Sequence, residues 1–130
     1  EMGKPIKESI GEVEKSAWCA DHYAEHGETY LAAVSLPSDA TRSYVQHLPL
    51  GVILGILPWN APFWLAFRFA APALMAGNTC VMKHDPHVPG CALKIEKAFK
   101  ELEMKEDLDA DLFALKKKMG RLGHGGSEAN

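Results

Sequence analysis

The sequence predicts an α/β protein in which a long amphipathic helix precedes a small parallel sheet with crossover helices. Three observations predict this fold class. Apolar residues recur every three or four positions near the start of the chain, the spacing of one helical face. Two short runs, GVILGIL and TCVMK, are apolar, as in strands buried on both faces of a parallel sheet. A helical pattern follows each run, and this alternation is typical of parallel sheets.

The first third of the chain is expected to hold the long helix and one strand. The residues EMGKPI predict a turn, and the helix then runs from Lys7 to about Leu31, with a bend at Gly27. Residues 36–39 predict a loop. Arg42 to Leu48 mixes apolar and polar residues, which favours a partly exposed strand.

The middle of the chain is expected to contain both buried strands and the helix between them. The predicted strands are Gly51–Leu57 and Thr79–Lys83. A tight PWNAP loop leads into a buried helix from Phe63 to Met75, and Gly77 with Asn78 ends that helix as a left-handed cap. An amphipathic helix is predicted from Cys91 to Leu102.

The character of the chain changes after Leu102. Residues 107–111 are acidic, residues 116–118 are a basic run, and LGHGGSEAN is rich in glycine. The segment LDADLFALKKKM favours one more helix, and the last residues favour a flexible tail. We therefore expect one domain over residues 1–102 and a divergent segment over residues 103–130.

Composition excludes several classes of function. The chain has 130 residues, 47% hydrophobic and 24% charged, as in an ordinary single soluble domain. Its net charge of -3 implies no broad basic surface, so nucleic acid is not an expected partner. Three cysteines without a C-x-x-C pair fit a reducing compartment and a cytoplasmic location. The chain begins with Glu and shows no leader peptide, which suggests that it starts inside a longer reading frame or that a start was removed.

A membrane span is not expected either. Between Leu48 and Gly77 the only charged residue is Arg68, but four prolines interrupt this apolar segment. A proline inside a helix costs about 3 kcal/mol, so no unbroken spanning helix of roughly 20 residues can form there.

Asn60 is the unusual residue of the apolar segment LPLGVILGILPWNAPFW. A buried amide without hydrogen-bond partners costs about 1–3 kcal/mol, so Asn60 needs something to bind. Taken blind, the sequence favours a cap on the helix that starts near Pro62. The alternative is a donor for a group that the chain binds.

Two groups of metal-binding residue types do not amount to a metal site. His22 and His26 are one helical turn apart, and His84, Asp85, His87 and Cys91 are close in sequence. Neither group matches a full zinc-ligand pattern, so no metal is predicted and both are interpreted as exposed polar residues.

The motifs together resemble the aldehyde dehydrogenase superfamily. PLGVILGILPWNAPFW, then an Arg, PALMAGN and KH, appear in that family's order and are closest to its succinate-semialdehyde dehydrogenase branch. EMGKPI and GEVEKSAW resemble its segment before the first cofactor-binding strand. The resemblance runs from Glu1 to about Leu102. It implies a partial Rossmann-like sheet, the front of a cofactor domain that binds NADP or NAD.

The resemblance also implies roles for single residues. The intact enzyme would oxidise a small aldehyde, such as succinic semialdehyde, to the acid, and Asn60 would donate a hydrogen bond to the oxyanion. Lys83 would contact the adenosine ribose. Leu57, Pro58 and Trp59 would line the cofactor cleft. Pro86 stands where NAD-preferring members often carry a Glu, so a repulsion of the 2′-phosphate of NADP is absent. His84 would add positive charge nearby if it is protonated.

Arg68, the cysteines and the activity of the chain as a whole each have more than one interpretation. Arg68 either pairs with an acid elsewhere, which we favour, or lies near the aldehyde pocket. The family's nucleophilic Cys and basic Glu motifs are absent, and Cys19, Cys80 and Cys91 are interpreted as structural, so the chain alone is expected to be inactive. The alternatives are a non-catalytic NAD(P)-binding or subunit-interaction module, or the product of a truncated gene that does not fold stably. Family members of full length are expected to be homo-oligomers, with contacts near Arg42–Leu48.

Overall fold

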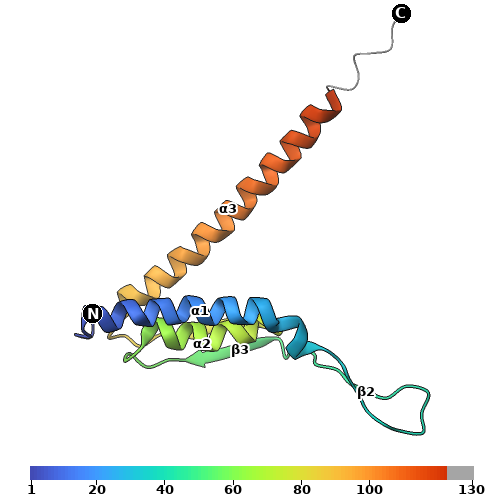
Figure 1. The fold of residues 1–130 in the computed structure, drawn as a ribbon. Coiled ribbons are helices and arrows are strands. Elements are labelled where there is room, and N and C mark those ends of the chain that lie inside the picture. Colours follow the sequence, from blue (N-terminus) through green and yellow to red (C-terminus); the bar gives the residue numbers. More distant parts are fainter. Residues whose placement is uncertain (123–130) are drawn as a thin grey trace, which may run out of the picture. The chain divides into compact units, whose positions relative to one another are not determined.

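The computed structural model describes residues 1–122, with side chains to residue 117. It is a mixed α/β structure with a long N-terminal helix and two small sheets, one of them parallel (Figure 1). The chain divides into two compact units, Glu1–Ala92 and Leu93–Asn130. The first unit holds both sheets and is described first.

The long helix α1 spans Ile6–Leu31, as the apolar periodicity predicts. It is continuous through Gly27, which is buried in the helix and not at its end. A Cβ at this position would lie 2.6 Å from Cγ of Met75, so the glycine allows α1 to approach the helix α2 closely. The reason for Gly27 is therefore a tertiary contact.

The helix α2 spans Pro62–Met75 and lies between α1 and the parallel sheet. Its first residue is a proline, which loses no helical hydrogen bond at that position. Its end is the predicted left-handed cap. Gly77 has φ +79°, and its N–H donates to the Leu74 carbonyl at 2.9 Å. Asn78 then donates from Nδ2 to Ala73 O and accepts from Leu50 N and Gly51 N, so it joins this cap to the start of the sheet.

The strands β3 (Val52–Ile56) and β4 (Thr79–Lys83) pair in parallel, as predicted. The prediction that both faces are buried is wrong. Residues 53, 55, 80 and 82 point toward the interior, where Gly55 lies beneath the Phe69 ring of α2, whereas Val52, Leu54 and Ile56 are between 61% and 73% exposed. Within the described residues only one layer of helix covers this sheet, so the outer apolar face has no neighbour.

The predicted strand Arg42–Leu48 is mostly irregular. Only β2 (Tyr44–Val45) is extended, and it pairs antiparallel with a two-residue strand, β1 (Val34–Ser35), that the sequence did not predict. Both strands are exposed. Pairs this short give little apolar patterning, which is why the sequence shows one strand where the structure has a small hairpin.

The helix α3 spans Pro89–Leu122 without interruption. The expected end near Leu102 is therefore wrong, and the predicted additional helix is the continuation of the same one. Residues 102–117 contain no proline or glycine, so nothing in the backbone ends the helix where the charge pattern changes. The predicted flexible tail, residues 122–130, lies outside the described residues except for its first residue, which ends α3.

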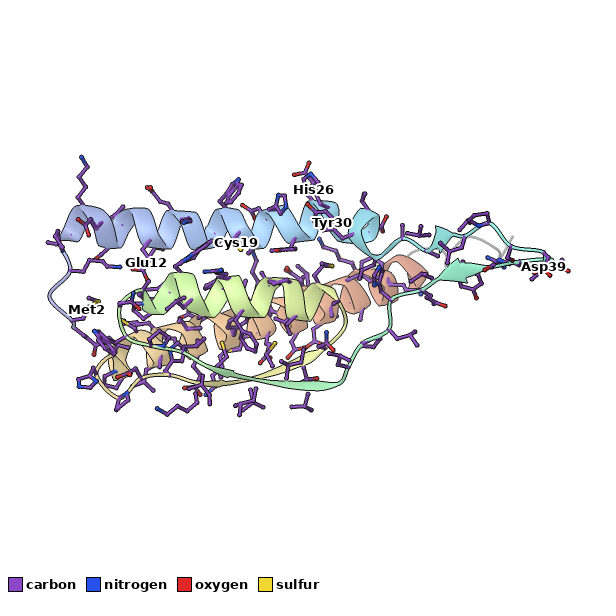
Figure 2. All side chains as sticks on the ribbon, turned by 90° about the horizontal axis from the view of Figure 1, so that it is seen from below. Met2, Glu12, Cys19, His26, Tyr30 and Asp39 are labelled. Carbon is purple, nitrogen blue, oxygen red and sulfur yellow. The ribbon has the colours of Figure 1, made fainter. Side chains whose placement is uncertain are left out.

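The buried core of the described chain is small. Its apolar members are Cys19, Leu57, Ala66, Ala70, Val88 and Ile95. Cys19 and the buried acidic residue Glu12 lie on the side of α1 that faces α2 (Figure 2). No helix of the described residues is long and apolar enough to cross a membrane.

Candidate active site

The candidate site lies where β3 and β4 end side by side. Their register places Ile56 next to Lys83, the last residue of each strand. The pairing continues one step further, because Leu57 N donates to Lys83 O at 3.0 Å. The carboxyl ends of parallel strands are the usual place for ligands in open α/β sheets. The two loops that leave the sheet here, together with Lys83 at the end of β4, hold all the predicted site residues except Arg68.

A ring contact brings the two loops together. The ring centroids of Trp59, after β3, and His87, after β4, are 5.9 Å apart and tilted by 50°. Leu57 is buried beneath the β3 loop, whereas Pro58 and Trp59 are exposed. The structure therefore places Leu57, Pro58 and Trp59 in the loop after β3, which contacts the loop after β4.

Asn60 is exposed and makes no side-chain hydrogen bond to the described residues. It does not cap α2: the N-cap residue is Ala61, and no side chain of the cap position bonds the helix. The capping interpretation that the isolated sequence favours is thus wrong. The amide of Asn60 leaves both its donors and its acceptor available at the end of β3.

Glu12 takes the capping role instead, and the sequence did not predict it. Its carboxylate accepts hydrogen bonds from Phe63 N at 2.8 Å and Trp64 N at 3.2 Å, the first turn of α2. Lys4 forms an ion pair with the other carboxylate oxygen. Glu12 is only 9% exposed. A negative charge at a helix N-terminus is favourable, so Glu12 fixes the start of α2 immediately after Asn60.

No local signal distinguishes Glu12 from its neighbours in sequence. Glu8 and Glu14 lie on the same helix and are exposed. The helical phase gives one hint, because Glu12 shares a face with Ser16 and Cys19, which are buried. An acidic residue on the buried face of a helix is a residue that needs a partner.

Lys83 ends β4, and the loop after it holds Pro86 and an unpredicted pair, Asp85 with His87. Lys83 and Pro86 are both exposed. Asp85 Oδ1 accepts from His87 N at 2.9 Å and bonds Nδ1 of the same residue at 2.6 Å. These bonds hold the pKa of the Asp85 carboxyl below its usual range, with the nearby Lys83 charge as a smaller cause. The loop therefore keeps a negative charge beside Pro86, directed toward His87.

His84 differs from its expected role. Both ring nitrogens are buried and have no hydrogen-bond partner among the described residues. Burial lowers the pKa of this imidazole from its ordinary value, because desolvation penalises the charged form. His84 is thus neutral near pH 7 and adds no positive charge to the loop.

The remaining candidates lie apart from these loops or are inert. Arg68 is exposed on α2, and no ion pair with an acidic side chain of residues 1–117 was found, so the expected structural ion pair is absent there. Cys19 is buried and Cys80 is half-buried in β4. Burial, followed by the Glu1 carboxylate, raises the pKa of the Cys91 thiol. A raised thiol pKa disfavours the thiolate, the nucleophilic form.

The Glu1 carboxylate, which contributes to the raised pKa of the Cys91 thiol, has a structural role of its own. It accepts from Gly90 N and Cys91 N, each at 2.9 Å, and so caps the start of α3. The same bonds lower the pKa of Glu1. The first residue of the described chain therefore fixes the far end of the β4 loop.

Comparison with known proteins decides the family. The profile of the aldehyde dehydrogenase family matches residues 1–117, beyond the Leu102 limit that the motifs indicate. This chain belongs to the aldehyde dehydrogenase family. The match includes both loops of the candidate site and most of α3.

Individual aldehyde dehydrogenases are similar over the same region. A probable succinate-semialdehyde dehydrogenase [NADP(+)] of Synechocystis sp. is 52% identical over 99 residues, 76% of this chain and 22% of the relative. The succinate semialdehyde dehydrogenase [NAD(P)+] Sad of Escherichia coli is 46% identical over 101 residues, 78% of this chain and 22% of the relative. The chain thus spans about a fifth of the length of these relatives.

A solved aldehyde dehydrogenase agrees in fold. The succinic semialdehyde dehydrogenase of Streptococcus pyogenes, in complex with NADP+ as the cofactor, superposes with a TM-score of 0.74 at 36% identity. The match covers 77% of this chain and 22% of that structure. The fold of this chain is therefore a fragment of the aldehyde dehydrogenase fold.

Proposed function

We propose that residues 1–102 supply the front of the cofactor domain of an NAD(P)-dependent succinate-semialdehyde dehydrogenase. In this proposal β3, α2 and β4 form one parallel crossover unit of a Rossmann-like sheet. The observation that carries the proposal is the state of Asn60: its amide is exposed and unbonded at the carboxyl end of β3, while Glu12 caps the adjoining helix. An unbonded amide beside a fixed helix start fits a ligand-binding role.

Asn60 would act on the charge that develops during aldehyde oxidation. When a thiolate adds to the aldehyde carbon, the carbonyl electron pair moves onto oxygen, and Nδ2–H of Asn60 would donate to that oxygen. Preorganised donors of this kind stabilise the transition state because they need no reorientation when charge appears. The helix α2 begins two residues later and is fixed by the buried Glu12 carboxylate. The backbone on one side of Asn60 is therefore constrained.

The β3 and β4 loops would hold the cofactor. Lys83 would donate to the ribose hydroxyls from the end of β4, with Leu57, Pro58 and Trp59 on the opposite side. NAD(P), when bound, accepts the hydride released from the aldehyde carbon. The geometry fits this role, because Lys83 is exposed, adjoins the end of β3 in register, and no ion pair with residues 1–117 was found for it.

Cofactor preference would depend on Pro86. A glutamate at that position would repel a 2′-phosphate, and Pro86 has no charge. Asp85 is close by, but its Oδ1 already accepts two hydrogen bonds from His87. We therefore do not expect this oxygen to take the place of the missing Glu as an acceptor for the ribose. We therefore expect NADP to be accepted, in keeping with the names of the similar proteins.

Substrate recognition and turnover require more than these residues. Arg68 is exposed and would suit the carboxylate of succinic semialdehyde only if it faces the aldehyde pocket. None of the three cysteines has the properties of a nucleophile, since two are buried or half-buried in elements and the pKa of the third is raised. The chain alone is therefore expected to give no turnover, and the assembled enzyme is expected to be a homo-oligomer.

A chimeric enzyme tests the proposal. The matching segment of Escherichia coli Sad is replaced by residues 1–102 of this chain, and reduction of NADP+ and NAD+ with succinic semialdehyde is measured. We expect activity, and we expect Asn60→Ala in the chimera to lower kcat by about 10²–10³-fold with little change in cofactor affinity. Pro86→Glu should weaken NADP+ binding and strengthen NAD+ binding.

Controls separate chemistry from folding. Asn78→Ala removes another asparagine that has a structural role, so it should lower thermal stability more than Asn60→Ala does. A chimera in which Asn60→Ala retains full kcat would refute the oxyanion role. The isolated chain, assayed with and without blocked thiols, should give no NAD(P)H; thiol-sensitive turnover would show that one of its own cysteines is catalytic. NADP+ binding without turnover would favour a non-catalytic binding module.

A further inference from the structure

The segment of α3 from Met104 to Leu115 carries an exposed apolar face. It consists of Met104, Leu108, Leu112 and Leu115, which are between 47% and 71% exposed. Spacings of four, four and three residues place these side chains on one side of the helix. An exposed helix face of large aliphatic residues is typical of a docking surface.

The charges along the same helix are divided into two blocks. Residues 101–111 contain six acidic residues and one lysine: Glu101, Glu103, Glu106, Asp107, Asp109 and Asp111, with Lys105. Residues 116–118 are three lysines. The apolar face runs past both blocks, with Leu112 between them. A second helix of the same sequence would therefore be complementary in charge in one direction and repulsive in the other.

We propose that this face binds a second copy of the chain through α3, with the two helices antiparallel. In the antiparallel arrangement the acidic block of each helix lies along the lysines of its partner. In the parallel arrangement the two acidic blocks lie against each other, as do the two lysine runs, which is destabilising. The single opposite-charge pair, at the junction of the blocks, does not offset this repulsion. The charge pattern thus selects both the partner and its direction.

The arrangement has a defined register. With Leu112 at the two-fold axis, Leu108 packs against Leu115 of the partner subunit. Asp109 and Lys116 flank the same edge of the apolar face, and Asp109 then lies near Lys116 of the partner subunit. By two-fold symmetry each such pair occurs twice. A parallel register would instead bring Asp111 near Lys116 of the partner subunit.

Sedimentation equilibrium of the full 130-residue chain tests the apolar face. We expect a monomer–dimer equilibrium, and Leu112→Glu should raise the dissociation constant at least about tenfold, because it places two like charges together at the axis. Phe113→Glu is the matched control. Phe113 is 70% exposed but projects from another side of the helix, so its substitution should leave the constant within about twofold.

Charge reversal tests the direction. Asp109→Lys and Lys116→Asp should each weaken the dimer, and the double variant should recover most of the loss. Circular dichroism of each variant shows that the helix is intact. Recovery of Lys116→Asp by Asp111→Lys alone would overturn the antiparallel register in favour of the parallel one. A chain that stays monomeric at high micromolar concentration, or a dimer unaffected by Leu112→Glu, would overturn the proposed surface.

Discussion

His84 and His87 lie in one loop, yet their rings have opposite surroundings. His87 is exposed and bonds the Asp85 carboxylate, whereas both nitrogens of His84 are buried without a partner among the described residues. Burial penalises the charged form of the His84 imidazole and lowers its pKa. The buried ring of His84 thus lacks hydrogen-bond partners among the described residues, whereas the exposed ring of His87 bonds the Asp85 carboxylate.

This difference predicts an acid-sensitive fold. In the unfolded chain His84 takes up a proton near the ordinary histidine pKa of 6.5, whereas in the folded chain this pKa is lowered by burial. Below pH 6.5 the unfolded state therefore binds more protons, so the free energy of unfolding should fall as the pH is lowered, until the folded-state pKa is passed. Urea unfolding of the chain between about pH 5 and 8 measures this slope.

A pair of variants isolates the contribution of His84. His84→Leu should flatten the slope between about pH 5 and 7, since the titrating group is gone, and should not reduce stability at neutral pH. His47→Leu, the same substitution at an exposed position, is the matched control for the change of side chain. Equal slopes in the wild type and His84→Leu would contradict the assignment.

The residues show how far a sequence can identify a site. Leu57, Pro58, Trp59, Asn60, Lys83 and Pro86 were all predicted as site residues, and the parallel pairing of β3 and β4 places them at or just after the carboxyl ends of two adjacent strands. Their roles remain proposals. The protonation of His84 could not be foreseen, because it depends on which neighbours cover the ring. The cap formed by Glu12 joins residues 51 positions apart, so no local pattern reveals it.

At the scale of elements, α2 connects the long helix of the first unit to its parallel sheet. It lies between α1 and the parallel sheet, and its N-terminus is fixed from α1 by Glu12. Two backbone N–H groups would lose their acceptor without this carboxylate, and Lys4 would lose its partner. The entry to α2, directly after Asn60, would become less ordered.

Replacing Glu12 should therefore destabilise the first unit. We expect Glu12→Ala to lower the free energy of unfolding by about 3 kcal/mol, because it removes a buried charged acceptor from two donors. Glu12→Gln keeps one acceptor oxygen and should lose less. Both values come from urea unfolding followed by circular dichroism.

Glu14→Ala provides the comparison on the same helix. Glu14 is exposed, so its loss should change stability by no more than about 0.5 kcal/mol. If Glu12→Ala and Glu14→Ala behave alike, the cap does not stabilise the fold. In the chimera, Glu12→Gln should also lower kcat less than Asn60→Ala does, because it acts on Asn60 only through position.

The elements also separate what sequence patterns can and cannot predict. Strong periodicity and a glycine cap predicted α1, α2 and β4 to within one residue at each end. The apolar pattern of β3 predicted where the strand lies but not which of its faces is exposed. Apolar residues on both faces show that a neighbouring element could cover each face, not that one does so. The change of charge after Leu102 was interpreted as a boundary, yet α3 continues through it, since composition can change along one helix.

At the scale of the whole molecule, many large apolar side chains of the described residues are exposed. The core is small, while the outer face of the parallel sheet exposes Val52, Leu54, Ile56 and Val81. Both strands of this sheet are also edge strands. Exposed apolar edges of this kind promote association without fixed stoichiometry. This behaviour differs from a dimer through α3, which has a defined mass.

Substituting the sheet face should therefore improve solubility at little cost in stability. A variant with Val52→Thr, Leu54→Thr and Ile56→Thr keeps β-branched or strand-compatible residues and removes apolar surface that already faces solvent. We expect lower light scattering and weaker binding of a hydrophobic dye, with a melting temperature within a few degrees of wild type. The measurement is made in the Leu112→Glu background, so that dimers through α3 do not contribute.

A substitution on the inward face of β3 should have the opposite effect on stability from the substitutions on its outer face. Ile53→Thr places a hydroxyl on the half-buried side of β3, toward α2, and should lower the melting temperature without reducing dye binding. Loss of cooperative melting in the triple variant would mean that the outer face is already covered in an assembly on which folding depends. In that case the exposed sheet face, and not α3, would be the principal contact between copies of the chain.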